Sequence, residues 1–435
     1  MTNFWCEHAL LPDGVAAGVL ITVDELGAIA DVRTGAEPEG ERLSGVVLPG
    51  FANAHSHAFH RALRGRAHAD GGTFWTWRTL MYQLADRLDP DSYLKLARAA
   101  YAEMAVAGFS AVGEFHYLHH GPGGVSYEDS NAMGEALRQA ALDAGIRLTL
   151  LDTCYLAGGI GVPLSESQKR FNDGTVDWWA DRVAELKPDS NTRHGVAIHS
   201  VRAVPRYALS TVARVADGRP LHIHLSEQPA ENEQCQAAYG LTPAGVLAEE
   251  GVLGENVTAV HATHLSTRDI ALLGGARATA CFCPTTEADL ADGIGPAREL
   301  ADAGVRLSLG TDQHAVVDPL LETRALEHGE RLRTGKRGRF TPAELLHAGT
   351  VAGHSCLGWP EAGRIAVGAP ADLVAVRTDT ARTAGSLPEQ VIMSATSADI
   401  HTTVTGGRVI SRDGVHETLG EVGPLLADAM KELWQ

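Results

Sequence analysis

Two patterns of apolar and polar residues alternate along the middle of the chain. Short apolar runs, rich in valine, isoleucine and leucine, are separated by longer segments whose apolar residues recur every three or four positions. The short runs predict buried strands and the longer segments predict amphipathic helices, several of which end in glycine. The expected strands cover residues 45–55, 110–117, 146–155, 194–200, 220–227, 257–264, 278–284 and 305–312.

Eight strands, each followed by a helix, predict a (β/α)8 barrel. A doubly wound open sheet is the competing architecture, but no GxGxxG motif opens the first helix. Residues 1–48 and 360–435 instead show short strands and turns, and neither segment alone could bury a core. We therefore expect one small β-sandwich domain built from both segments, with the barrel, residues 49–359, inserted between them.

Composition and charge narrow the class of protein. A chain of 435 residues is long enough for a large α/β domain and a small companion. The net charge of −18 argues against nucleic acid and anionic membranes as partners, and no apolar run is long enough to span a bilayer. Six cysteines without a CxxC pair, and no secretory signal in the first residues, predict a cytoplasmic protein. An anionic substrate would need local arginines to overcome the negative field.

Histidines and acids gather at the ends of the predicted strands, where barrel enzymes carry their chemistry. A lone histidine at a strand end is more often a hydrogen-bonded structural residue. Such residues at five strand ends are hard to explain by packing, because each buried polar group must find a partner. The residues are His55 and His57 (first strand), His199 with Arg202 just beyond (fourth), His222, His224 and Glu227 (fifth), His261 and His264 (sixth), and Asp312 and His314 (eighth).

A metal site is the chemistry that this pattern favours. His55 and His57 point to the same face because a strand repeats every two residues. Imidazoles together with a carboxylate suit a borderline divalent ion such as zinc or iron. Four such ligands leave a position for water, whose pKa falls on the ion from about 15.7 toward about 7. The candidate ligands are His55, His57, His224 and Asp312.

The spacing alone does not choose between His222 and His224, which share a face of the fifth strand. Glu227 follows three residues after His224, where it could reach the same water as a general base, and this favours His224. Residues 188–335 contain no lysine, so the fourth strand cannot supply the carboxylated lysine that often bridges two metals in barrel hydrolases. A single metal ion is therefore expected.

Four motifs, in this order, resemble the amidohydrolase superfamily in its one-metal deaminase branch. They are PGFANAHSHAFH (49–60), HIHLSE (222–227), VHATH (260–264) and LGTD (309–312). GRIAVGAPADLV (363–374) resembles the segment that closes the β-sandwich of that superfamily, so the likeness covers nearly the whole chain.

A closer resemblance is to the formimidoylglutamate deiminases. It lies in NAHSHAF (53–59), FWTWRTLMY (74–82), GEFHYLHH (113–120), HSVRAV (199–204) and LHIHLSEQ (221–228). The resemblance implies one divalent metal, zinc or alternatively iron(II), and hydrolysis of a small anionic substrate, N-formimidoyl-L-glutamate, to N-formyl-L-glutamate and ammonia. It also implies a homodimer. The alternatives are a related aminohydrolase for a purine, pyrimidine or other amidine or guanidino compound, and a non-catalytic barrel.

The same resemblance assigns roles to individual residues, with two departures. Glutamine usually stands at the position of His60, and serine at that of Gln313, and both departures bear on the substrate rather than on the reaction. The implied metal ligands are His55, His57, His224 and Asp312, with Asp312 also counted as catalytic; Glu227 and His261 are the proton-handling pair; Arg202 and His199 bind the glutamate part; and Arg78, Tyr117 and His60 are further substrate contacts.

Overall fold

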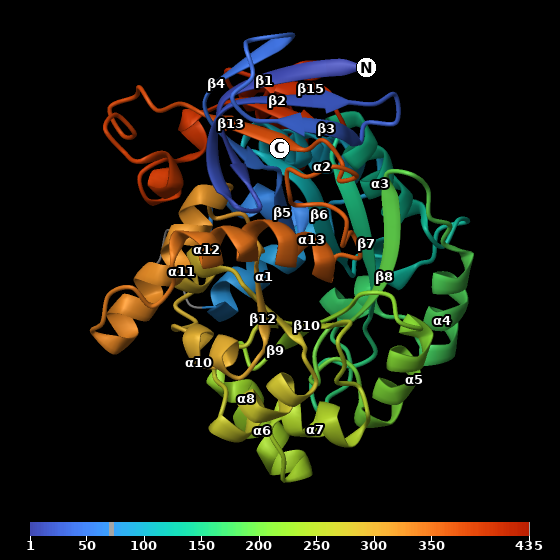
Figure 1. The fold of residues 1–435 in the computed structure, drawn as a ribbon. Helices are drawn as coiled ribbons and strands as arrows, with labels where there is room; N and C mark the ends of the chain where they lie inside the picture. Colours follow the sequence, from blue (N-terminus) through green and yellow to red (C-terminus); the bar gives the residue numbers. More distant parts are fainter. Residues whose placement is uncertain (69–73, 435) are drawn as a thin grey trace.

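The computed structural model describes residues 1–68 and 74–434, and its centre is a barrel of parallel strands (Figure 1). The strands lie side by side in chain order, so each pairs with the next one along the sequence. The predicted (β/α)8 barrel is therefore confirmed. The strands are β5 (Phe51–Ser56), β6 (Phe109–His116), β7 (Arg147–Cys154), β8 (Thr192–Ile198), β9 (Leu221–Leu225), β10 (Val257–His261), β11 (Thr279–Phe282) and β12 (Arg306–Leu309).

The first and last strands close the barrel just beyond their regular parts. The amides of Thr311 and Asp312 donate to the His55 carbonyl at 3.1 and 3.0 Å, and the His57 amide donates to the Asp312 carbonyl at 3.1 Å. Asn53 adds a side-chain link, because its Nδ2 donates to Thr311 Oγ1 at 2.7 Å. This seam brings the candidate ligands His55 and His57, from the first barrel strand, next to the candidate ligand Asp312, which follows the last barrel strand.

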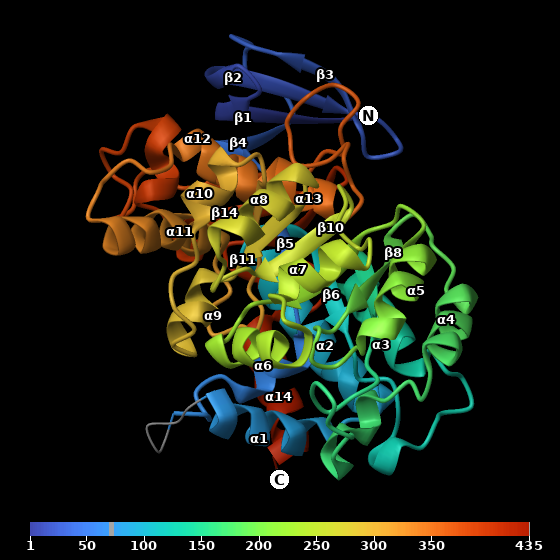
Figure 2. The ribbon, with the colours of Figure 1, turned by 90° about the horizontal axis from the view of Figure 1, so that it is seen from below.

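Helices surround the barrel and connect its strands (Figure 2). Short 3-10 or π turns accompany them in the loops and at helix ends. The helices are α1 (Phe74–Ala85), α2 (Pro90–Val106), α3 (Ala132–Ala144), α4 (Val176–Glu185), α5 (Arg206–Ala216), α6 (Pro229–Tyr239), α7 (Pro243–Glu249), α8 (Thr267–Gly275), α9 (Pro284–Asp289), α10 (Ala297–Asp302), α11 (Pro319–Thr334), α12 (Pro342–His347) and α13 (Gly353–Cys356). The turns are η1 (Ala58–Leu63), η2 (Pro122–Gly124), η3 (Glu166–Phe171), η4 (Ala348–Ala352), η5 (Pro388–Met393) and η6 (Ser397–Asp399).

A second sheet joins the two ends of the chain, as expected, and lies at the top of Figure 1. Its hydrogen-bonded order is β17-β16-β15-β14-β13-β4-β1-β2-β3, one continuous sheet in which β4 from the first segment pairs with β13 from the last. The strands are β1 (Thr2–Leu11), β2 (Gly14–Val23), β3 (Ile29–Arg33), β4 (Glu41–Pro49), β13 (Leu373–Val376), β14 (Ile400–Thr405), β15 (Arg408–Arg412), β16 (Val415–His416) and β17 (Gly420–Glu421).

The final helix, α14 (Val422–Trp434), leaves this sheet and packs on α2 of the barrel. Val422 and Leu426 contact Ala99 and Ala102 there, and Figure 2 shows the two helices together. The segment 360–435 thus contributes both to the sheet and to the barrel surface. The exact domain boundaries, 1–48 plus 360–435 and 49–359, stay a prediction.

The expected strand over residues 45–55 is split in two at Gly50, which separates β4 in one sheet from β5 in the other. A Cβ on Gly50 would lie 2.4 Å from Ser110 Oγ and 2.8 Å from the Cβ of Asp372. Only glycine therefore lets the chain cross between the two sheets at this point. The apolar run is continuous in sequence, so its pattern does not reveal the break.

A plug fills the barrel at the amino ends of its strands. Leu357 and Trp359 are buried there, next to Ala54 of β5. Thr149 Oγ1 donates to the Leu357 carbonyl at 2.7 Å and accepts from Trp359 Nε1 at 3.0 Å. With this end filled, the open end of the barrel is the one at which the strands finish.

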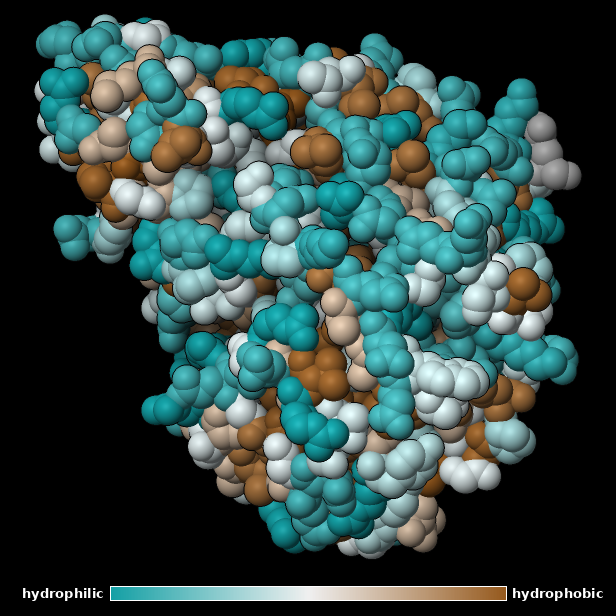
Figure 3. All heavy atoms as spheres, turned by 90° about the vertical axis from the view of Figure 1, so that its right-hand side faces the viewer, coloured by the Kyte–Doolittle hydropathy of each residue, from teal (hydrophilic) through white to brown (hydrophobic). Residues whose placement is uncertain are grey.

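The face shown in Figure 3 is mostly hydrophilic, with apolar side chains scattered over it. No described helix is long and apolar enough to cross a membrane. All six cysteines are buried and none of these described residues forms a disulfide.

Candidate active site

Four candidate ligands converge at the carboxyl ends of β5, β9 and β12. His55 Nε2 lies 3.2 Å from His224 Nε2 and 3.3 Å from Asp312 Oδ1. His57 Nε2 lies 3.3 Å from the same carboxylate oxygen. All four side chains are buried, so their donor atoms face one another in a space that little water reaches.

The ring nitrogens of two of these histidines are oriented by backbone carbonyls. His57 Nδ1 donates to the Phe115 carbonyl at 2.9 Å, and His224 Nδ1 donates to the His199 carbonyl at 3.0 Å. A carbonyl only accepts, so Nδ1 carries the hydrogen and the Nε2 lone pair faces the cluster. Burial, together with neighbouring histidines, lowers the pKa of His57 to about 3 and that of His224 well below its usual value.

These neutral nitrogens and one carboxylate fit a borderline divalent cation. The Nε2 lone pair of His57 faces the Asp312 carboxylate oxygen across 3.3 Å, and this approach is repulsive unless a cation lies between the two atoms. A set of imidazoles with one carboxylate suits zinc or iron rather than magnesium or calcium.

His222 lies outside this cluster. Its Nε2 is 3.3 Å from the carbonyl of Cys356, in the plug. Two residues of a strand span about 6.6 Å, so His222 shares the inward face with His224 but occupies a layer closer to the plug. The structure therefore brings His224, and not His222, to the candidate metal site.

Glu227 and His261 stand beside the cluster. His261 Nε2 is 3.8 Å from Glu227 Oε1 and 4.0 Å from Asp312 Oδ2, and its Nδ1 is 3.5 Å from Glu287 Oε1. Burial alone would lower the pKa of His261, but the surrounding carboxylates outweigh burial and raise it well above its usual value. The arrangement can hold a proton between the Glu227 carboxylate and the His261 imidazole, next to the candidate metal site.

The backbone turns sharply where these residues leave the barrel. His261 has a φ of +66° and Asp312 a φ of +43°, in the left-handed region that non-glycine residues seldom adopt. Ser226, just before Glu227, has a φ of +51°. Such conformations persist only where the surrounding structure enforces them, and they often occur at functional sites.

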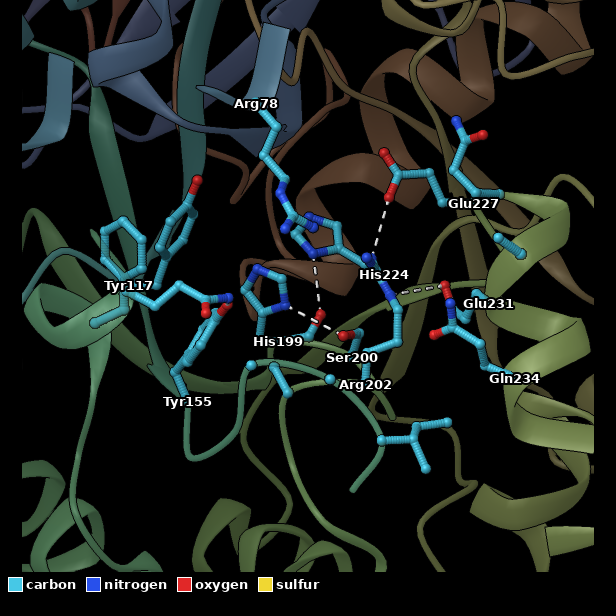
Figure 4. Close-up of a pocket in the computed structure, with 18 of the residues that line it drawn as sticks. Arg78, Tyr117, Tyr155, His199, Ser200, Arg202, His224, Glu227, Glu231 and Gln234 are labelled. Atoms are coloured by element: carbon cyan, nitrogen blue, oxygen red, sulfur yellow. Dashed lines mark hydrogen bonds and ion pairs between the residues drawn. The ribbon is translucent and has the colours of Figure 1, made fainter. Parts of the chain in front are cut away.

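A cavity of about 610 Å³ opens above the cluster, and Arg202 lies in its wall (Figure 4). The guanidinium group lies between two acids: Nη2 is 3.5 Å from Glu227 Oε2, and Nε is 3.5 Å from Glu231 Oε2. Burial would lower the pKa of Arg202, but these two carboxylates raise it, so the group stays charged. Burial raises the pKa of Glu231 to about 6.

The other predicted substrate contacts line the same cavity. His60 Nε2 and Tyr117 Oη are joined by a hydrogen bond of 2.9 Å, and the Tyr117 ring lies 5.4 Å from that of His199. Arg78 reaches into the cavity from the side opposite Arg202 in Figure 4. Sequence reasoning thus placed Arg78, Tyr117, His60, His199 and Arg202 around one space.

Gln313, the second departure, is not among the described residues that line the cavity. Its side-chain amide donates to Asp289 Oδ2 at 2.7 Å. His264 and His314 have local partners outside the cluster: His264 Nε2 donates to the Asp292 carbonyl at 2.8 Å, and His314 Nε2 is 3.0 Å from Ser56 Oγ.

Four further residues at the site were missed from the sequence: Tyr155, Gln168, Glu231 and Glu287. Tyr155 ends the predicted third strand, so a search for tyrosines as well as histidines at strand ends would have found it. The other three lie in loops and helices, and their sequence gives no signal of their position.

The chain belongs to the amidohydrolase family, whose model matches residues 46–410. Formimidoylglutamate deiminase of Pseudomonas aeruginosa is 37% identical to it, over 96% of both chains. The crystal structure of an amidohydrolase from Brucella melitensis superposes with a TM-score of 0.91 at 32% identity, over 100% of both chains. An adenosine deaminase from Xanthomonas campestris, solved with bound zinc, shares the fold with a TM-score of 0.83 at 21% identity, over 99% of this chain and 97% of its own. The two resemblances found in the sequence, to the amidohydrolase superfamily and to the formimidoylglutamate deiminases, are both confirmed.

Proposed function

We propose that the protein hydrolyses N-formimidoyl-L-glutamate to N-formyl-L-glutamate and ammonia. The observation that carries the proposal is a cavity in which Arg202 and Arg78 lie beside the buried histidine–aspartate cluster. A formimidoyl group needs hydrolytic machinery, and a glutamate part needs cations. The name of the Pseudomonas relative supports the same substrate.

In this proposal His55, His57, His224 and Asp312 hold one divalent ion, zinc or alternatively iron(II). When bound, such an ion lowers the pKa of a coordinated water and supplies a nucleophile at neutral pH. The amidohydrolase family, to which the chain belongs, is metal-dependent, and this supports the proposed ion.

Glu227 is the group that moves protons. Its carboxylate takes a proton from the attacking water, whose oxygen forms a bond to the formimidoyl carbon. It then gives that proton to the formimidoyl nitrogen. The second hydrogen of the water, now on the oxygen bonded to the carbon, passes through Glu227 to the same nitrogen as the C–N bond breaks, so that ammonia leaves and a formyl C=O remains. His261, 3.8 Å from Glu227 Oε1, orients the water and offsets the negative charge that develops.

The substrate's carboxylates are held by the cavity wall. Arg202 suits this role because its planar fork matches a carboxylate through two parallel hydrogen bonds, and His199 lies next to it. Arg78 acts on the opposite side, and Tyr117 and His60 are further contacts. His60 keeps a polar contact with Tyr117, which supports the same site despite the departure at that position.

A related aminohydrolase for a purine, pyrimidine or guanidino compound is the alternative. Its supporting observation is the set of aromatic rings in the cavity wall, Trp77, Tyr82, Tyr117 and Tyr155. A flat base would stack on such rings but would not use two arginines, so formimidoylglutamate is favoured.

Ammonia release decides between these proposals. Protein loaded with zinc is expected to release one ammonia per formimidoylglutamate, and to be much slower on a panel of purines, pyrimidines and guanidino compounds. Preference for any other member of the panel would overturn the substrate assignment.

We also propose, from the resemblance, that the protein is a homodimer in the cytoplasm. Light scattering of the protein as it elutes from a sizing column tests whether it is a dimer.

A further inference from the structure

The side-chain amide of Gln168 has a fixed orientation. Its Oε1 accepts from the backbone amide of Ser165 at 2.9 Å and from Ser165 Oγ at 3.0 Å. A backbone N–H can only donate, so the oxygen of the Gln168 amide must face Ser165. The nitrogen therefore faces the other way, and Gln168 Nε2 donates to Tyr155 Oη at 2.8 Å.

This hydrogen bond makes the Tyr155 oxygen an acceptor. Because Gln168 presents only N–H groups on this side, the Tyr155 hydroxyl hydrogen cannot point at Gln168 and turns elsewhere. Burial raises the pKa of the Tyr155 phenol, so the hydroxyl keeps its hydrogen and remains a donor.

Tyr155 is held in place through both its backbone and its ring. The backbone amide of Tyr155 donates to Asp173 Oδ2 at 2.7 Å, and the backbone carbonyl of Tyr155 accepts from the Asp173 amide at 3.0 Å. The ring meets the edge of His199 with their centroids 4.6 Å apart. The hydroxyl is thus presented by a ring that has little freedom to move.

Tyr155 lines the cavity together with both arginines, and Figure 4 shows it on the same side as His199. Arg202 and Arg78 are near enough to lower the pKa of the Tyr155 phenol in part against the effect of burial. A hydroxyl donor that shares a cavity with two arginines matches the chemistry of an anion and not that of a cation.

We propose that Tyr155 is a substrate-binding residue whose hydroxyl donates to a carboxylate of the anionic substrate, and that Gln168 is the positioning residue that directs this hydrogen into the cavity. The proposal rests on the proposed function only in taking the substrate to be a carboxylate. It adds the Tyr155 hydroxyl as a third donor beside the two arginines. It also extends the site to residues 165–168, which are distant in sequence from the residues of the histidine–aspartate cluster.

Tyr155→Phe, Gln168→Met and the double variant test the proposal in a cycle. Tyr155→Phe removes only the hydroxyl, and KM for formimidoylglutamate is expected to rise about tenfold to a hundredfold, with kcat changed less. Gln168→Met releases the hydroxyl to rotate, so KM rises by a smaller factor, about threefold. The double variant is expected to match Tyr155→Phe, because Gln168 acts only through the hydroxyl.

The controls separate this role from a structural one. Tyr207→Phe and Gln236→Glu change exposed residues on α5 and α6 and should leave both constants unchanged. Formamidine, which has no carboxylate, should be hydrolysed equally by all variants. Equal losses on formamidine and formimidoylglutamate would overturn the proposal, and so would a Gln168→Met effect that is undiminished in the Tyr155→Phe background.

Failure of the proposed function is visible separately. If the wild-type protein does not act on formimidoylglutamate, calorimetric binding of glutarate, a plain dicarboxylate, replaces the kinetic assay. Weaker glutarate binding by Tyr155→Phe supports the inference, and unchanged binding refutes it. Melting temperatures show whether each variant is folded. If Gln168→Met does not fold, glutarate binding by Tyr155→Phe alone tests whether the Tyr155 hydroxyl binds the carboxylate.

Discussion

Replacing Arg202 by methionine is expected to impair hydrolysis of formimidoylglutamate far more than hydrolysis of formamidine. The methionine keeps much of the length and apolar volume of the side chain but removes the charge. In the structure the Arg202 guanidinium is 3.5 Å from both Glu227 and Glu231 and only 17% of the side chain is exposed. It is therefore the cation that offsets two acids before any substrate arrives.

The magnitude follows from this geometry. Two unit charges 3.5 Å apart attract by about 5 kcal/mol at an effective dielectric constant of about 20. Removing one partner of a buried, hydrogen-bonded charge pair costs about 2–5 kcal/mol, much of it because the other charge is left unpaired. For a substrate carboxylate this predicts a loss in kcat/KM of about 30-fold to several thousandfold.

Part of that loss is common to both substrates, because Arg202 also faces Glu227, the proposed base. The assay therefore compares the losses: ammonia release is followed with formimidoylglutamate and with formamidine, and the ratio of the two kcat/KM values isolates the carboxylate. Arg206→Met is the matched control, since Arg206 lies four residues further along and pairs with Glu249 and Glu250 outside the cavity. Metal content should stay the same in both variants.

An unchanged ratio would refute the reasoning. It would mean that Arg202 serves only to balance Glu227 and Glu231 and that the glutamate part of the substrate binds elsewhere.

Three further outcomes are expected. Elemental analysis should find about one divalent ion per chain, and His224→Ala should lose it while His222→Ala keeps it; retention by His224→Ala would contradict the ligand set. Glu227→Gln should lower kcat by about 10² to 10⁴ without loss of metal, and near-normal turnover would place the base elsewhere. Burial disfavours the Asp372 carboxylate, but Arg147 outweighs it and holds the pKa of Asp372 below its usual value, so the pair stabilises the fold above about pH 4 and the contribution disappears as pH falls further. Acid unfolding of Asp372→Asn should show less of this low-pH dependence, and an identical curve would count against it.

Much of the site could be predicted because two simple rules turn sequence into position. Strand period and the strand-end rule placed His55, His57 and Asp312 together, although Asp312 lies more than 250 residues from the other two. Both rules depend only on local sequence once the barrel is recognised. Glu227 followed from its spacing after His224.

The rest depended on contacts that no local pattern encodes. The split at Gly50 arises where two sheets meet, and the neighbours that force it, Ser110 and Asp372, are distant in the chain. Strand period alone did not separate His222 from His224; the position of Glu227 favoured His224, but the contact of His222 with the plug could not be predicted. Gln168 faces Tyr155 only because of the path of the loop between them.

The seam between β5 and β12 also sets the order in which the site can be made. Asn53 and Thr311, which join across it, are 258 residues apart, so a growing chain presents the first two histidines long before their aspartate partner exists. If the proposed ligands hold an ion, their set is complete during synthesis only after the last barrel strand has docked beside the first. Capture of the ion would then fasten that seam, and a chain truncated before β12 would expose paired histidines with nothing to complete their coordination.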